Sequence, residues 1–437
     1  MSLKKFSFRQ AVFEANRCLL CHDAPCSRGC PAGTDPGTFI RKLRFKNVTG
    51  AARTIKANNI LGWACGALCP AARLCEKECA ASGIGEPIAI AGIQRAVMEH
   101  AWAMGFNPLG TPPEKKGPAA AVLGAGPAGL ACAAELARSG FPVSIFESRP
   151  EPGGAMRHAI PARRLDPALL EREIDDIRFL GADFQCGTPV EGDGAVEKLF
   201  GSGFQAVFMS PGLWEAQTLA PGMGKTPGLF SSIRFLEGLR ENADPNPGQA
   251  GWEIAGKTVA VIGGGSAAMD CAVSAAQAGA RDVFVIYRRS WLQMPAEARE
   301  KKEALDAGVH FLFFSRPEKY ISPNGAVAGL ELIRTEPEDR TDASGRRAVR
   351  DVKDSRWSLA ADIVIEALGN RPGEGVKRLH PDIRMDGGLI QTDARRRTSA
   401  PGVFAGGDAA SGPGLVALAV RDGKIAANAM KAYLAAS

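Results

Sequence analysis

The stretch AAAVLGAGPAGLACAAELARSGFPVSIFE, residues 119–147, decides the fold of this chain. An apolar run is followed by closely spaced glycines, then by apolar residues at helical spacing, and then by a second apolar run. This order predicts a buried strand, a tight turn, a helix and a second strand, at residues 119–123, 124–129, 127–139 and 143–146. Strand, helix and strand in this order build a parallel sheet, so we expect an α/β fold.

The turn carries a complete dinucleotide-binding fingerprint. Gly124 permits the tight turn, Gly126 lets the backbone approach a pyrophosphate, and Gly129 allows close packing of helix on strand. Glu147 ends the second strand, where a carboxylate can bond a ribose hydroxyl. The predicted dinucleotide contacts here are Gly124, Gly126, Pro127, Ala128, Gly129 and Glu147.

The same pattern recurs further along the chain, with alanine in the third glycine position. Its strand, helix and strand are predicted at 257–262, 267–278 and 283–287. The last strand is followed by Arg288 and Arg289 instead of ending in an acid. Guanidinium groups there favour the 2′-phosphate of NADP, although a solvent-exposed strand end would also explain them. The predicted contacts are Gly263, Gly265, Ser266, Ala267, Arg288 and Arg289.

Two fingerprints require two dinucleotides, and the segment Phe404–Asp408 indicates which is which. In flavoproteins with two dinucleotides, such a Gly-Asp segment returns to the first domain, where its Asp meets the flavin's ribityl or phosphate chain. The first site is therefore predicted to bind FAD, with Gly407 and Asp408, and the inserted second unit to bind a nicotinamide. The chain is predicted to cross between the two domains at residues 210–212 and 367–369. In the second of these segments, Ala367 and Gly369 are further predicted nicotinamide contacts. Simple turns at strand ends would explain both segments equally well.

Eight of the eleven cysteines lie between residues 18 and 79. They form two groups of four: Cys18, Cys21, Cys26 and Cys30, then Cys65, Cys69, Cys75 and Cys79. Eight thiolates at such intervals suffice for two iron–sulfur clusters or two zinc ions, and the cysteines alone leave both open. A disulfide framework suits short secreted chains, whereas this chain is long and begins Met-Ser-Leu-Lys-Lys, without an apolar signal core.

Composition narrows the function classes. Hydrophobic residues at 45% and charged residues at 23% are ordinary for a globular protein of 437 residues. The net charge of +6 is scattered, and its one basic run, Arg395-Arg396-Arg397, predicts an exposed loop, so nucleic acid is not an expected ligand. No apolar run reaches membrane-spanning length, and we expect a soluble protein of the reducing cytoplasm without a membrane partner.

Three domains follow from these patterns. Residues 1–117 are predicted to be all-α, with a helix that starts after Pro87 and a linker at 110–118. Residues 118–217 and 370–437 form the predicted FAD-binding domain, and residues 218–369 form a NAD(P)-binding domain inserted in it. Both are expected to be Rossmann-like.

The cysteine-rich runs also carry a family resemblance. They read CLLCHDAPCSRGCP at 18–31, NILGWACGALCP at 59–70 and LCEKEC at 74–79. Their spacing resembles the N-terminal half of dihydropyrimidine dehydrogenase, and the whole chain is similar to the separate FAD-carrying subunit of the bacterial NAD-dependent enzymes. The wider family includes the small subunit of glutamate synthase. The resemblance implies two [4Fe–4S] clusters.

Residue by residue, the resemblance implies two ligand sets. These are Cys18, Cys21, Cys26 and Cys79 for one cluster, and Cys30, Cys69, Cys75 and Gln94 for the other. Cys65 would then be a spare thiol, and Gln94 would otherwise be predicted as a surface helix residue. The resemblance also makes Gly153, Gly154 and Arg164 flavin contacts. The remaining cysteines, Cys132, Cys186 and Cys271, are predicted to be buried small apolar residues.

The implied activity is that of an electron-input subunit. A nicotinamide gives up hydride and a cluster accepts single electrons, so FAD would link the two without a catalytic acid or base from the chain. A partner with FMN and further clusters would reduce uracil and thymine to dihydropyrimidines, reversibly. The alternatives are the NADPH-dependent small subunit of glutamate synthase and a zinc-stapled, non-enzymatic redox sensor. The family favours NADH whereas Arg288 and Arg289 favour NADPH, so the nicotinamide stays open.

Overall fold

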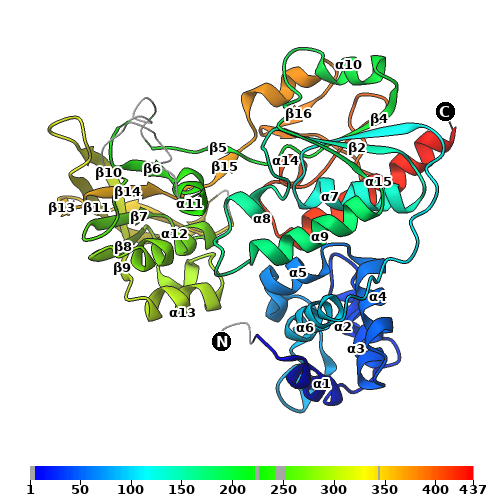
Figure 1. Ribbon diagram of the computed structural model, residues 1–437. Helices are drawn as coiled ribbons and strands as arrows, with labels where there is room; N and C mark the ends of the chain where they lie inside the picture. Colours follow the sequence, from blue (N-terminus) through cyan, green and yellow to red (C-terminus); the bar gives the residue numbers. More distant parts are fainter. Residues whose placement is uncertain (1–4, 220, 222–225, 242–251, 343–344, 437) are drawn as a thin grey trace. The chain divides into compact units, whose positions relative to one another are not determined.

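The computed structural model describes residues 5–219, 221, 226–241, 252–342 and 345–436; four of the five N-terminal residues Met-Ser-Leu-Lys-Lys therefore lie outside the described range. The described chain divides into two compact units. Of the described residues, the larger unit comprises 5–157, 162–214 and 371–436, and the smaller unit comprises 158–161 and those between 215 and 370. Figure 1 colours the chain by residue number, from blue at the N-terminus to red at the C-terminus.

The N-terminal part of the larger unit is helical, as predicted. Ser7 and Gln10 form a capping box at the start of the first helix, and the Asp35 carboxylate accepts from Thr38 N at the start of the third. The helices are α1 (Phe8–Asn16), α2 (Pro25–Arg28), α3 (Pro36–Arg44), α4 (Val48–Asn58), α5 (Gly62–Leu68), η1 (Ala71–Arg73), η2 (Ala80–Gly83) and α6 (Ile90–Ala103).

A five-stranded parallel sheet completes the larger unit, in the order β18-β4-β1-β2-β3. The C-terminal strand β18 pairs with β4, so the segment before Gly407 does return to the sheet of the first fingerprint. The long helix α15 packs on α7 (Figure 1). The elements are β1 (Ala119–Leu123), α7 (Pro127–Arg138), β2 (Val143–Glu147), α8 (Ala155–His158), α9 (Pro167–Phe179), β3 (Asp183–Cys186), α10 (Ala195–Gly201), β4 (Phe204–Met209), η4 (Glu374–Leu379), β16 (Met385–Asp386), β17 (Leu389–Ile390), β18 (Val403–Ala405), α14 (Asp408–Ser411) and α15 (Val416–Ala436).

The smaller unit repeats this design with a second parallel sheet, in the order β6-β14-β7-β8-β9. Its central strand β7 is buried along its whole length, which matches an apolar run between two covered faces. The elements are β5 (Glu215–Ala216), β6 (Leu229–Ser231), α11 (Ser232–Glu241), β7 (Thr258–Ile262), α12 (Ser266–Gln277), β8 (Asp282–Tyr287), η3 (Trp291–Gln293), α13 (Ala298–Asp306), β9 (His310–Phe313), β14 (Ile363–Glu366) and β15 (Asn370–Arg371).

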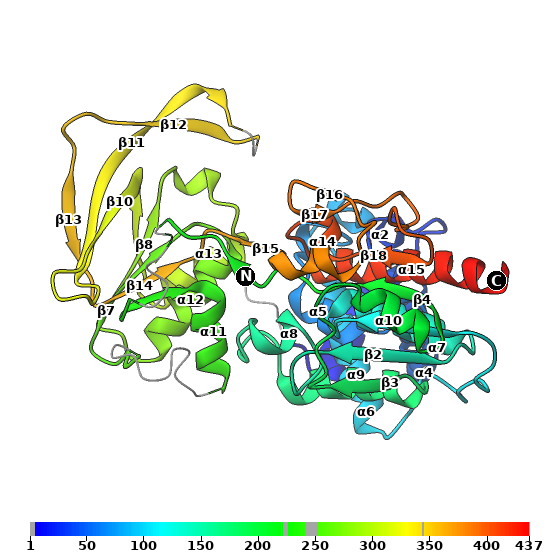
Figure 2. The same cartoon turned by 90° about the horizontal axis from the view of Figure 1, so that it is seen from above.

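An antiparallel sheet is inserted before β14, and the sequence patterns did not predict it. Strand β11 pairs with β10, β12 and β13. Figure 2 shows β11 and β12 running out beyond the parallel sheet. The strands are β10 (Ser315–Ile321), β11 (Gly329–Thr341), β12 (Arg347–Asp351) and β13 (Trp357–Ala360).

Two predicted degrees of burial were wrong, and a third holds only in part. Cys186 is only half-buried, at the end of the edge strand β3, whereas Cys132 and Cys271 are fully buried as predicted. Arg395 and Arg397 are exposed in a loop as predicted, whereas the guanidinium of Arg396 between them turns inward to the buried Asp422. Gln94 is buried rather than on the surface of α6.

Among the described residues, no helix combines the length and the apolar character needed to cross a membrane.

Candidate functional site

The first fingerprint forms a turn between β1 and α7 in which close contacts require its glycines. Gly124 has φ +93°, and a Cβ on it would lie 2.5 Å from Ser210 O. A Cβ on Gly129 would lie 1.9 Å from Gly124 O, so the start of α7 packs directly on the turn. The free N–H groups at the start of α7 can therefore face a pyrophosphate.

A second loop approaches this turn. Gly153 N–H donates to Ala125 O at 2.9 Å, and a Cβ on Gly154 would lie 2.7 Å from Gly126 Cα. The resemblance implied that Gly153 and Gly154 contact the flavin, and the structure brings them against the fingerprint. Arg164, the third residue of that set, lies half-buried in the loop after α8.

Glu147 is buried at the end of β2 and shapes the same turn. Its Oε2 accepts from Ala125 N at 2.8 Å, and its Oε1 accepts from Arg149 N at 2.9 Å. The carboxylate therefore lies at the strand end where a ribose is expected, anchored to the backbone on both sides.

The Gly407–Asp408 segment also approaches the start of α7. Gly407 has φ +67°, and a Cβ on it would lie 2.9 Å from the Ala128 Cβ. Asp422, a buried acid on α15, accepts from Gly407 N at 3.2 Å and from Ser411 Oγ at 2.7 Å, and it pairs with Arg396. Burial, reinforced by the nearby Asp422 charge, raises the pKa of Asp408 to about 6.

The second fingerprint repeats this geometry in the smaller unit. Gly263 has φ +138°, and a Cβ on it would lie 2.4 Å from the backbone oxygen of Ala367. Gly265 is the N-cap of α12, whose first residues are Ser266 and Ala267, and a Cβ on Gly265 would meet no described atom within 4 Å. Open space at a helix N-terminus is what an approaching pyrophosphate needs. Gly369 lies two residues beyond Ala367, with φ +99°.

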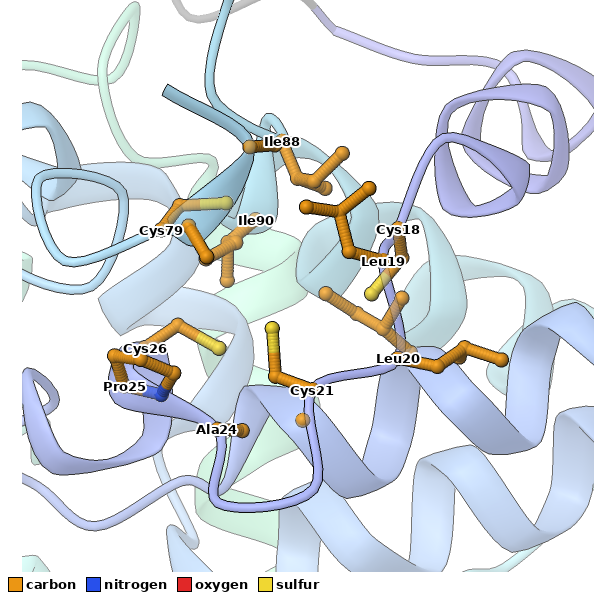
Figure 3. A pocket seen from close by; sticks show the side chains of 14 residues that line it. Cys18, Leu19, Leu20, Cys21, Ala24, Pro25, Cys26, Cys79, Ile88 and Ile90 are labelled. Carbon is orange, nitrogen blue, oxygen red and sulfur yellow. The ribbon is translucent and has the colours of Figure 1, made fainter. Parts of the chain in front are cut away.

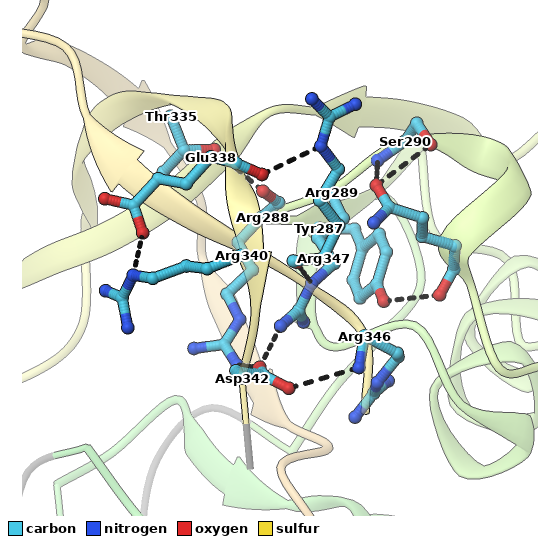
Figure 4. A network of polar contacts seen from close by, with 11 residues as sticks. Tyr287, Arg288, Arg289, Ser290, Thr335, Glu338, Arg340, Asp342, Arg346 and Arg347 are labelled. Atoms are coloured by element: carbon cyan, nitrogen blue, oxygen red, sulfur yellow. Dashed lines mark hydrogen bonds and ion pairs between the residues drawn. The ribbon is translucent and has the colours of Figure 1, made fainter. Parts of the chain in front are cut away.

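The two arginines after β8 lie in different surroundings, as Figure 4 shows. Arg289 is 1% exposed; its Nε donates to Arg347 O at 2.8 Å, and its Nη2 bonds the Asp342 carboxylate. Arg288 is half-exposed, and its Nη2 lies 3.4 Å from the same carboxylate. No sequence pattern pointed to Asp342, which directly follows β11 of the inserted antiparallel sheet.

Four cysteines line one cavity in the helical part of the larger unit. They are Cys18, Cys21, Cys26 and Cys79, and apolar residues such as Ile40 and Ile90 complete the walls (Figure 3). Burial and then the neighbouring thiols of Cys79, Cys18 and Cys21 raise the pKa of Cys26 to about 11. Four thiolates so placed repel one another unless a positively charged centre lies among them, so this donor set fits an iron–sulfur cluster.

The other four cysteines also lie together. The pKa of the Cys69 thiol is raised, most strongly by a hydrogen bond with the Cys65 thiol and next by burial. The charges of Cys65, Cys30 and Cys75 raise it further. Cys30 also accepts from Thr34 N at 3.4 Å. Cys65, predicted to be a spare thiol, therefore lies beside the predicted ligands. The Gln94 amide donates to Gly62 O at 2.5 Å, at the start of the helix that carries Cys65.

Two lysines tie the cysteine-bearing helices to the first dinucleotide domain, and sequence reasoning missed both. Lys56 is fully buried; its Nζ lies 2.8 Å from both Glu173 Oε1 and Asp176 Oδ2 on α9. Glu173 in turn accepts from Trp63 N and Ala64 N, at the start of α5.

Lys424 on α15 donates to Ala32 O at 2.8 Å and to Asn58 O at 2.5 Å. The sequence does contain one indication that Lys424 has a structural role, because it is one of a few charged residues in an otherwise apolar helix.

The family matches agree with this division. Residues 118–423 match the pyridine nucleotide–disulphide oxidoreductases, and residues 2–106 match the 4Fe–4S cluster domain II of dihydropyrimidine dehydrogenase. The chain therefore belongs to the pyridine nucleotide–disulphide oxidoreductase family, and it is an NAD(P)H-dependent flavin oxidoreductase with FAD and [4Fe–4S] cofactors. The zinc-stapled scaffold is set aside, because the matched cysteine domain is an iron–sulfur domain.

Relatives cover nearly the whole chain. The glutamate synthase [NADPH] small chain of Escherichia coli K12 is 33% identical over 98% of this chain and 92% of its own length. The NAD-dependent dihydropyrimidine dehydrogenase subunit PreT of the same organism is 33% identical, over 98% and 95%. The structure of Mycobacterium tuberculosis FprA in complex with NADPH superposes with a TM-score of 0.62 at 18% identity, over 74% of this chain and 85% of that one, and this likeness concerns the fold alone.

Proposed function

We propose that this chain is the electron-input subunit of a dihydropyrimidine dehydrogenase. It would oxidise NAD(P)H at FAD and pass electrons through two [4Fe–4S] clusters to an FMN-containing partner that reduces uracil and thymine, in a reversible reaction. The observation that carries the proposal is the joint match of the two parts: an iron–sulfur domain of the dihydropyrimidine dehydrogenase type precedes the two dinucleotide folds. Similarity to the PreT subunits over 97–98% of the chain supports it.

Bound FAD supplies the conversion between the two-electron chemistry of a nicotinamide and the one-electron chemistry of a cluster. The chain's own part at this site is to bind and orient. Backbone N–H groups at the start of α7 would hold the pyrophosphate, Glu147 a ribose hydroxyl, and Asp408 the ribityl or phosphate chain. Support comes from the close approach of Gly154 and Gly407 to this turn.

The nicotinamide dinucleotide would bind at the second turn, with its pyrophosphate at the start of α12 and its adenosine ribose beside Arg288. The open space at Gly265 supports this placement. Holding each dinucleotide at a fixed place is the contribution that the chain itself makes to the rate.

For the clusters, we assign Cys18, Cys21, Cys26 and Cys79 to the first, and Cys30, Cys69, Cys75 and Gln94 to the second. The shared cavity supports the first set. Anaerobic analysis of the purified protein should find about eight iron atoms and eight sulfides per chain. Cys26→Ala should lose about half of both while FAD stays bound; full iron content in that variant would contradict the first ligand set.

The small subunit of glutamate synthase is the second candidate, because that relative is as similar as the PreT subunit. Combining the purified chain with each candidate partner separates the two. Anaerobic NAD(P)H-dependent conversion of uracil to dihydrouracil supports the first proposal. Formation of glutamate from 2-oxoglutarate and glutamine, with uracil left unreduced, would replace it by the second.

A further inference from the structure

Asp342 follows the long strand β11 and reaches back to the end of β8 (Figure 4). Its Oδ2 accepts from Nη2 of both Arg288 and Arg289, and its Oδ1 accepts from Arg346 N at 3.4 Å. One carboxylate thus bonds both guanidinium groups that follow the second fingerprint strand.

Other contacts also fix the two arginines. Arg289 Nε donates to Arg347 O at 2.8 Å, and Thr335 Oγ1 donates to Arg288 O at 2.8 Å. The backbone after β8 is therefore held by the antiparallel sheet as well as by the Asp342 side chain. Removing the Asp342 charge while keeping its shape should leave this frame in place.

The local charge balance is positive. Burial and then the nearby charge of Arg289 lower the pKa of Arg288, whereas Asp342 raises it and Arg346 lowers it further. Two guanidinium groups therefore pair with one carboxylate, and the charge of Arg346 acts on Arg288 as well. A 2′-phosphate would add negative charge to this group, favourably toward the arginines and unfavourably toward Asp342.

We propose that Asp342 is a specificity-determining residue of the nicotinamide site: its carboxylate occupies donors that a 2′-phosphate would use, and so reduces the preference for NADP(H) over NAD(H). The inference rests on the proposed nicotinamide site. It accounts for a chain that has the arginine pair expected for NADP and yet resembles both NAD-dependent and NADPH-dependent relatives equally closely.

The test is a calorimetric titration of the oxidised holoenzyme with NADP⁺ and with NAD⁺, which differ only in the 2′-phosphate. Asp342→Asn keeps the side-chain shape and an oxygen acceptor. It should tighten NADP⁺ binding about tenfold and leave NAD⁺ binding within about twofold, because one close negative charge is lost. The gain should shrink as salt is added.

Asp351→Asn is the matched control. Asp351 carries the same charge on the neighbouring strand β12, and it pairs with Arg316 on β10. This variant should change neither affinity. In the Arg288→Gln background, Asp342→Asn should give a smaller gain, because one of the two competing donors is gone.

Weaker or unchanged NADP⁺ binding by Asp342→Asn overturns the inference, since Asp342 would then support the arginines instead of competing for them. Equal tightening of both nucleotides overturns it as well. A wild-type protein that binds neither nucleotide defeats the nicotinamide-site assignment itself, whereas binding of both with no effect of Asp342→Asn defeats this inference alone.

Discussion

The ammonium group of Lys56 is fully buried. Burial alone would lower its pKa, but the carboxylates of Asp176 and Glu173 raise it, so the group is charged. A buried ion pair is a weak source of net stability, yet breaking one leaves a buried charge unpaired. Because Glu173 also holds the backbone at the start of α5, the pair fixes the helix that carries Cys65.

Lys56→Met should therefore destabilise the protein by about 3–5 kcal/mol. Denaturant unfolding followed by tryptophan fluorescence measures this loss. Lys116→Met, at an exposed lysine in the linker, serves as the control and should change stability by less than about 0.5 kcal/mol. Adding Glu173→Gln to Lys56→Met should recover part of the loss; a double variant less stable than the single would contradict the account.

Asp408 gives a pH-dependent prediction. Its pKa is raised to about 6, so the folded protein favours the protonated form. The stability from this group is fully present below the unfolded pKa of about 3.9 and is lost as the pH rises through about 6. In the FAD-free protein, Asp408→Asn should remove this loss.

The free energy of unfolding of Asp408→Asn should thus exceed that of wild type by an amount that grows from pH 4.5 to pH 7 and reaches about 1–2 kcal/mol at the upper end, and a rising difference in melting temperature would report it. The exposed Asp386, changed to Asn, is the control, and its difference from wild type should vary less with pH. If the stability difference between Asp408→Asn and wild type becomes smaller toward pH 7, burial is not the main influence on the pKa of Asp408.

At the scale of elements, α15 packs closely on α7, the helix of the first fingerprint, at Gly423. A Cβ on Gly423 would lie 2.2 Å from Ala128 O and 2.9 Å from Cys132 N. An Ala in place of Gly within a helix normally stabilises by about 0.5–1 kcal/mol, but here the methyl group has no space.

Gly423→Ala should consequently destabilise the protein by about 1–3 kcal/mol and weaken FAD binding, because α7 must shift. FAD release on heating, detected by flavin fluorescence, checks both effects together. Gly201→Ala at the end of α10 is the matched control, since a Cβ there meets no described atom within 4 Å. The same FAD release temperature in Gly423→Ala and wild type would refute the packing argument.

What sequence could predict differs from element to element. The strands and helices around Gly124 and Gly263 were predicted closely, because local apolar runs and glycine spacing determine them. The antiparallel sheet was missed, because its strands 315–360 are rich in charges and have no clear alternation. The contacts of Lys56 and Asp342 could not be predicted at all, since their partners come from distant segments of the chain.

At the scale of the whole chain, the positive charge is concentrated in the cysteine-bearing part, so the interpretation that it is scattered was wrong. Residues 1–106 contain fourteen Lys and Arg but seven Asp and Glu, whereas the complete chain has a net charge of only +6. The dinucleotide-binding remainder is therefore close to neutral. If electrons leave through the clusters, they leave from the most basic part of the protein, and an acidic electron acceptor would be attracted there.

Reduction of an anionic one-electron acceptor should accordingly slow as salt is added, and reduction of a cationic acceptor should not. Ferricyanide and hexaammineruthenium(III) provide this comparison in stopped-flow experiments with the NADH-reduced protein. Charge reversal at Arg28, which is largely exposed, should reduce the ferricyanide rate constant at low salt and lessen its salt dependence. Lys302→Glu, at an exposed lysine on α13 of the smaller unit, carries the same charge change and should leave that rate unaltered. If both variants slow the reaction equally, either the net charge of the whole protein attracts the acceptor or electrons leave directly from the flavin. Electron exit through the basic iron–sulfur part would then be contradicted.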